Sequence, residues 1–113
     1  MNDLELCKKF SEMEGVDAFV YRGSYLLYPN DQGSMFENGM TCDWYNPITN
    51  LALNCAARDK YKIEIEYVSE RLMYVSISEY LVNEKIPIIS VRVNNKSGIP
   101  RAVIECILKS TVA

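Results

Sequence analysis

The first third of the chain shows the apolar pattern of one helix and then of a hairpin. Three apolar residues recur at helical spacing, Leu6, Phe10 and Met13. Asn2 is a residue type that caps helices, and Gly15 is a natural stop. Residues 16–22 then alternate as a strand does, and residues 25–28 return after the turn signal at Gly23 and Ser24. The pattern therefore predicts a helix followed by a β-hairpin.

Between residues 29 and 46 neither a helical nor a strand period holds. Glycines and asparagines interrupt this segment repeatedly, at Asn30, Gly33, Asn38 and Gly39. A structureless connection of this length is unusual in a compact domain and tends to be functional or disordered. We therefore expect a long irregular loop at about residues 29–46, ordered at its C-terminal end.

The pair Asn46 and Pro47 predicts a helix start, because asparagine caps helices and proline fits the first helical position. Apolar residues follow at helical spacing, at Ile48, Leu51, Ala52, Cys55 and Ala56. Three strands are expected next, at residues 61–68, 72–78 and 87–93. The last of these is apolar almost throughout, which favours a central place in the sheet.

A final helix is predicted from Pro100 onward, after loop chemistry at residues 94–98. Its expected inner face follows the i, i+3, i+4, i+7, i+8 pattern and comprises Ile99, Ala102, Val103, Cys106 and Ile107. The predicted order is α-β-β-loop-α-β-β-β-α. Strands joined by short turns pair antiparallel, so we expect an α+β fold with a sheet of about four to five strands flanked by three helices. The length fits a single domain over residues 1–113.

Charge and cysteine usage narrow the class of protein. The chain has 12 basic and 15 acidic residues, a net charge of −3, with no block of one sign. This argues against direct nucleic-acid binding and against binding to anionic membranes, both of which need clustered Lys and Arg. We see neither an export signal nor an apolar run near the ~18 residues of a membrane span. The expectation is a cytoplasmic protein, in a bacterial host cell, with reduced thiols.

The sequence contains few of the residue patterns that catalysis requires. Histidine is absent, so Ser-His-Asp and Cys-His pairs cannot form. The four cysteines are too widely spaced for a zinc site, and no glycine-rich phosphate loop is present. Cys55 and Cys106 lie on apolar helix stripes, which leaves Cys42 as the only candidate reactive thiol. We expect no enzyme activity, no cofactor and no metal.

The sharpest local feature is the expected loop end and helix start at residues 43–50. It holds the only Trp beside a Tyr, and several acid or amide groups, near a helix N-terminus whose N–H groups suit a polar ligand. The candidate binding residues are Asp43, Trp44, Tyr45, Asn46 and Asn50. The alternative is purely structural, with Trp44 fixing the loop to the core and Asn46 capping the helix. A second candidate surface is formed by the eight tyrosines, most of them in or beside strands, since such rings favour interfaces.

Two segments resemble a known family. Residues 45–53, Tyr-Asn-Pro-Ile-Thr-Asn-Leu-Ala-Leu, followed by residues 58–63, Arg-Asp-Lys-Tyr-Lys-Ile, resemble the second-helix signature of small tailed-phage proteins of the NinX type, and are similar to phage ABA-sandwich domains. Residues 98–108, Gly-Ile-Pro-Arg-Ala-Val-Ile-Glu-Cys-Ile-Leu, resemble the Pro-started helix that closes the family. The expected N-terminal helix resembles the family's opening one. The resemblance implies a sheet flanked by helices and a phage accessory protein.

We therefore expect a non-enzymatic phage or prophage accessory protein that binds a host protein or protein complex. An inhibitor of a host defence complex is the narrower expectation, by analogy. The alternative is a module that binds or sequesters a small molecule, such as a nucleotide-like signal near Trp44 and Tyr45. A flat exposed aromatic patch favours the first function, and an enclosed pocket with Arg58 or Arg101 favours the second. A homodimer through a sheet face or edge is compatible with either.

Overall fold

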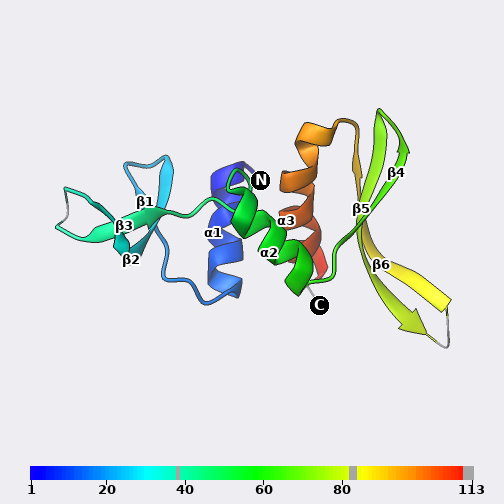
Figure 1. Cartoon of the computed structure of the whole chain (residues 1–113), viewed down its shortest axis with the longest axis horizontal. Coiled ribbons are helices and arrows are strands. Elements are labelled where there is room, and N and C mark those ends of the chain that lie inside the picture. Colours follow the sequence, from blue (N-terminus) through cyan, green and yellow to red (C-terminus); the bar gives the residue numbers. More distant parts are fainter. Residues whose placement is uncertain (38, 82–83, 111–113) are drawn as a thin grey trace. The chain divides into compact units, whose positions relative to one another are not determined.

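The computed structural model describes residues 1–37, 39–81 and 84–110, so Asn38 of the expected loop lies outside the described residues. The chain divides into two compact units, an N-terminal unit, Met1–Asn46, and a C-terminal unit, Pro47–Ala113. Each unit combines helix with a three-stranded antiparallel sheet (Figure 1). The α+β class with antiparallel pairing is confirmed. The strands that the structure describes form two small sheets, where one larger sheet was expected.

The N-terminal unit begins with helix α1, Asp3–Met13, and continues with three strands. The expected cap is confirmed, because the Glu5 N–H donates to Asn2 Oδ1 at 2.9 Å. Strands β1, Phe19–Tyr21, and β2, Tyr25–Met35, form the predicted hairpin, with Tyr21 opposite Tyr25. Strand β3, Thr41–Trp44, pairs with the other edge of β2, which gives the sheet order β1-β2-β3.

The irregular loop expected at residues 29–46 is mostly strand, since β2 runs on to Met35 and β3 follows. A bulge in β2 interrupts the alternation that would indicate a strand. Pro29 and Ser34 both pair with Cys42, so the residues between them have no partner in the register. At Gly33 an added Cβ would lie 2.1 Å from the Cys42 carbonyl oxygen. Only glycine fits this close approach of two backbones.

The C-terminal unit contains helix α2, Leu51–Lys60, three strands, a short 3₁₀ helix η1, Lys96–Gly98, and helix α3, Ile99–Ser110. Helix α2 starts later than predicted, because its cap is Asn50, whose Oδ1 accepts from the Leu53 N–H at 3.2 Å. Pro47 opens a turn before the helix. Its carbonyl oxygen accepts from Asn54 Nδ2 at 2.8 Å, so this turn is tied to the first turn of α2.

The second sheet has the order β4-β5-β6, formed by β4, Glu64–Ser69, β5, Leu72–Leu81, and β6, Glu84–Val93. The central strand is therefore β5, and the expectation that residues 87–93 form the central strand is wrong. Pro87 has no N–H to donate to a second neighbour, which confines such a residue to an edge strand. On strand β4, Tyr67 and Val68 are exposed.

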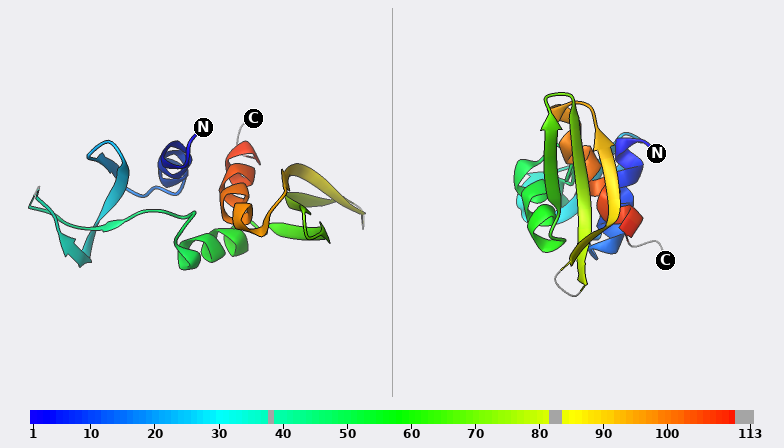
Figure 2. Two further views of the ribbon diagram at one scale, coloured as in Figure 1. Left: turned by 90° about the horizontal axis from the view of Figure 1, so that it is seen from above. Right: turned by 90° about the vertical axis from the view of Figure 1, so that its right-hand side faces the viewer.

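Helix α3 packs on β5 and β6 and provides the core of the C-terminal unit (Figure 2). All five residues of its predicted inner face are buried, and Ile104 is buried with them. On the sheet, Met73 and Val75 are also fully buried, as their shared face predicts. The apolar stripe of α3 is therefore confirmed as the main contact between helix and sheet.

Candidate functional site

Four aromatic rings gather on one face of the β1-β2-β3 sheet: Tyr21, Tyr25, Phe36 and Trp44. The register explains the gathering, because Tyr21 lies opposite Tyr25 and Trp44 lies opposite Leu27, two residues along β2 from Tyr25. Residues two apart on a strand share a face. Phe36 follows β2 and is held by the turn, where its N–H donates to the Met40 carbonyl oxygen at 3.0 Å.

The four rings contact one another in a chain. The ring centroids are 5.4 Å apart for Tyr21 and Phe36, 5.5 Å for Phe36 and Trp44, and 5.0 Å for Trp44 and Tyr25. Each contact is edge-to-face, the geometry that aromatic quadrupoles favour. The rings therefore hold one another in place.

The outer sides of these rings face solvent. Trp44 is 47% exposed, Tyr25 50% and Met35 75%. With Arg22 and Glu37 they line an open hollow of about 390 Å³, which we call the aromatic hollow: Tyr21, Arg22, Tyr25, Met35, Phe36, Glu37 and Trp44. Large exposed aromatic and apolar side chains in one place are typical of an interaction surface.

One ion pair lies at the rim of the aromatic hollow. The Arg22 guanidinium donates to the Glu37 carboxylate and also lies over the Tyr21 ring, 5.2 Å from its centroid. The hydrogen bond and opposite charge of this pair lower the pKa of the Glu37 carboxyl and raise the pKa of Arg22. The positive charge of Arg22 is thus already matched within the chain.

The structure separates the residues that the sequence grouped as one binding segment. Trp44 lines the aromatic hollow, while Asp43 is exposed beside it and accepts from the Trp44 N–H at 2.8 Å. Tyr45 is buried and packs edge-to-face on Tyr28, with centroids 5.8 Å apart. Asn46 accepts from the Cys7 thiol at 3.6 Å, and Asn50 caps α2 in the other unit. Of the five candidate residues, only Trp44 lines the aromatic hollow.

Sequence reasoning missed most of the aromatic hollow. Tyr21 and Tyr25 were noted only as strand tyrosines, and Phe36, Met35, Arg22 and Glu37 were not singled out. The hairpin at Gly23 could have placed Tyr21 opposite Tyr25, because a short loop fixes the register of a hairpin. Phe36 had no such signal, since its position depends on the bulge in β2.

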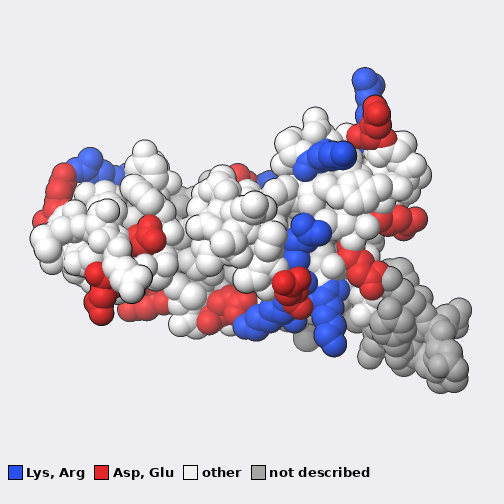
Figure 3. All heavy atoms as spheres, viewed as in Figure 1, with Lys and Arg blue, Asp and Glu red and all other residues white. Residues whose placement is uncertain are grey.

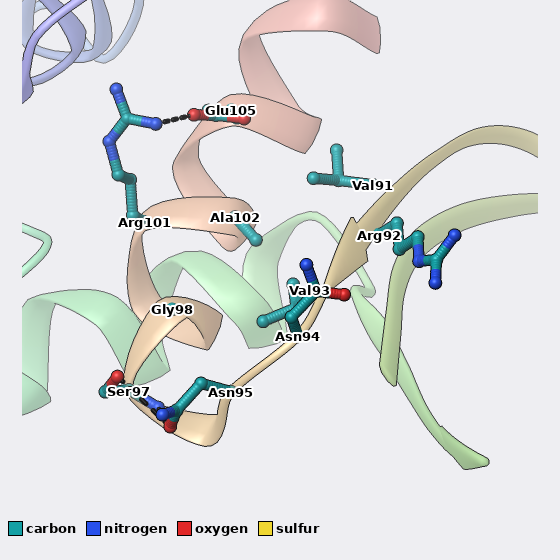
Figure 4. Close-up of a pocket in the computed structure, with 10 residues that line it drawn as sticks. All are labelled: Val91, Arg92, Val93, Asn94, Asn95, Ser97, Gly98, Arg101, Ala102 and Glu105. Carbon is teal, nitrogen blue, oxygen red and sulfur yellow. Dashed lines mark hydrogen bonds and ion pairs between the residues drawn. The ribbon is translucent and has the colours of Figure 1, made fainter. Parts of the chain in front are cut away.

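A second open hollow, of about 310 Å³, lies in the C-terminal unit between the end of β6 and the first turns of α3 (Figure 4). Arg101 lines it and forms an ion pair with Glu105 one helical turn away. Arg58, the other basic residue expected at a sequestering pocket, does not line it.

None of the four cysteines forms a disulfide, and none lines either hollow. Cys42 is fully buried, a position that does not suit the reactive thiol considered for it. Burial also raises the pKa of the Cys106 thiol. Across the described residues, no cluster of three His, Cys, Asp or Glu side chains has metal-binding geometry. None of the helices in that part of the chain combines the length and apolar character needed to cross a membrane.

The two units differ in charge. The N-terminal unit has 3 basic and 8 acidic residues, a net charge of −5, and the C-terminal unit has 9 basic and 7 acidic residues, a net charge of +2. Figure 3 shows most of the Lys and Arg side chains of the visible face over the C-terminal unit, where they are mixed with acidic ones. The aromatic hollow thus belongs to the acidic unit.

Comparison with known proteins gives no match for this chain among family models, curated proteins or solved structures.

Proposed function

We propose that this chain is a non-enzymatic binding protein that holds a partner protein at the aromatic hollow. The observation that carries the proposal is the chain of four mutually packed rings, of which Trp44 and Tyr25 are half exposed. Trp and Tyr are the residue types most enriched at binding hot spots. Rings already fixed by their neighbours lose little conformational freedom on binding, which favours affinity.

Two features favour a protein over the alternative ligand, a small molecule. The aromatic hollow is open, whereas small-molecule sites enclose most of their ligand. The second hollow is also open, and its Arg101 is paired with Glu105. Neither offers the enclosed basic pocket that a nucleotide-like signal needs.

Charge argues against a nucleic-acid partner at this surface. Stacking of bases on aromatic rings is normally combined with basic residues that track the phosphates. Here the unit carries a net charge of −5, and Arg22, the one basic residue that lines the aromatic hollow, is paired with Glu37. A protein surface with apolar and basic residues matches the site better.

The narrower proposal is a phage accessory protein whose partner is a host protein or complex, including a defence complex. It is supported by the resemblance of residues 45–53, 58–63 and 98–108 to NinX-type phage proteins, and the aromatic hollow supports only the binding part. Bacterial lysate is therefore the appropriate source of partners.

The experiment is a quantitative pull-down from bacterial lysate with the parent chain and three variants. Tyr25→Ala and Trp44→Ala remove exposed rings from the hollow, and Tyr67→Ala removes an exposed ring from β4 as the matched control. The partner should be depleted at least tenfold with the first two variants and retained with the third. Equal recovery with all four baits would contradict the proposal.

A further inference from the structure

The groove between β6 and α3 follows the outer edge of a strand. In the described part of the C-terminal unit, β6 is the last strand of the order β4-β5-β6 and pairs only with β5. The free side of an edge strand presents backbone N–H and C=O groups that can pair with another chain. Three consecutive residues of β6 line the groove, Val91, Arg92 and Val93.

The side chains of these residues alternate, although all three residues line the groove. Val91 and Val93 point toward α3, and Arg92 points to the opposite side of the sheet (Figure 4). Because residues of both orientations contribute, the groove runs along the backbone of β6 rather than over one face. The opposite wall is one face of α3, formed by Arg101, Ala102 and Glu105. A strand edge facing a helix is a geometry that accepts an extended peptide.

We propose that this groove binds an extended segment of a partner protein that carries an acidic residue between two apolar ones and joins the sheet as a fourth strand beside β6. The added strand would pair with the backbone of residues 91–93, and α3 would contact every second side chain of the strand. This groove lies in the C-terminal unit and the aromatic hollow lies in the N-terminal unit. The inference about the groove can therefore be tested independently of the proposed function.

The register defines the peptide chemistry. A residue of the added strand opposite Arg92 lies on the polar face of the sheet, where Arg92 is exposed and its neighbour across β5 is Tyr74. An opposite charge at this cross-strand position is favourable, so Asp or Glu fits there. The two flanking side chains face α3 near Ala102, beside Val91 and Val93, and should be apolar. The preferred core is therefore apolar, acidic, apolar.

Selection from a displayed library of random heptapeptides on the immobilised full chain tests this inference. Enriched peptides should share the apolar-acidic-apolar core, and their synthetic versions should shift the backbone amide NMR signals of residues 91–93 and 101–105. Arg92→Glu should weaken their binding at least tenfold. Arg71→Glu makes the same charge change at an exposed position outside the groove and should leave binding unchanged.

Three results would overturn the inference. One is a library that yields no enrichment, or enrichment without an acidic centre. Another is peptides that bind the Arg92→Glu and parent chains equally, or that shift signals elsewhere. The third is a parent chain that is a dimer in solution and that Arg92→Glu dissociates, because a second copy would then occupy the edge of β6.

Discussion

The Tyr25 ring packs edge-on against Trp44, with ring centroids 5.0 Å apart and an interplanar angle of 63°. This contact joins β2 to β3 on the exposed face of the N-terminal sheet, and both residues leave about half of their surface to solvent. The pair thus stabilises the strand pairing and leaves aromatic surface exposed at the site where we propose that a partner binds.

The close approach at Gly33 predicts a selective loss of stability in the N-terminal unit. An added Cβ would meet the Cys42 carbonyl oxygen at 2.1 Å, so the backbone of β2 or β3 must shift. Gly33→Ala should lower the free energy of unfolding by about 1–3 kcal/mol, as overpacking does. Because Trp44 lies in the N-terminal unit, urea unfolding followed by its fluorescence measures the loss of stability in that unit. Ser34→Ala, at the exposed neighbouring position, should stay within about 0.5 kcal/mol of the parent.

The helix cap assigned to Asn50 is directly testable. Asn50→Ala removes the acceptor of the Leu53 N–H and should lower stability by about 1 kcal/mol. Asn50→Asp keeps an acceptor at the same position and should stay close to the parent. The comparison is made by thermal unfolding followed by far-UV circular dichroism. A larger loss in Asn50→Asp than in Asn50→Ala would show that α2 begins elsewhere.

The inner face of α3 predicts a severe effect of a buried charge. Val103 is fully buried, so Val103→Asp would place a carboxylate in the core. The variant should lose about 3 kcal/mol or more, or fail to fold. Lys109→Asp, at an exposed position of the same helix, should stay near the parent in circular dichroism melts. A Val103→Asp variant that melts within a degree or two of the parent would refute the packing of α3.

Burial of Cys106 predicts a dependence of stability on alkaline pH. Its thiol pKa is raised above the ordinary 9.0, so the folded state keeps a proton that the unfolded state releases. The thiol therefore makes its full contribution to the free energy of unfolding below about pH 9, and this contribution falls as the pH rises further. The stability difference between the parent and Cys106→Ala should shrink above pH 9 in urea unfolding. Valine and alanine do not titrate, so the stability difference between the parent and Val103→Ala should not shrink above pH 9.

The parts of the fold that sequence predicts are those set by local pattern. The α1 cap at Asn2 and the inner face of α3 depend on residues close in the chain, and both are confirmed. The pairing of β2 with β3 depends on a bulge whose glycine must fit against Cys42, a contact between distant residues that no local period reveals.

The residues of the predicted binding segment lie on different surfaces for a related reason. Trp44 ends β3, and the extended pairing continues to Tyr45, whose N–H donates to the Leu26 carbonyl oxygen at 2.9 Å. Adjacent residues in extended backbone point to opposite faces, so Trp44 and Tyr45 cannot share one surface. One ring accordingly faces the aromatic hollow and the other is buried beside Tyr28. Because Tyr45 is buried, Tyr45→Ala would disturb packing and is no clean probe of binding. Asp43→Lys, beside Trp44, is a usable binding probe because Asp43 is exposed.

The most direct test of the binding role is the dissociation constant of the captured partner, measured by calorimetry for the parent, Tyr25→Ala and Tyr67→Ala. Removal of the Tyr25 ring should weaken binding at least tenfold, a loss of about 1.4 kcal/mol or more, with the melting temperature nearly unchanged. Removal of the Tyr67 ring, which is somewhat more exposed than Tyr25, should leave the dissociation constant unchanged. Equal dissociation constants for all three chains would show that the partner does not bind at the aromatic hollow.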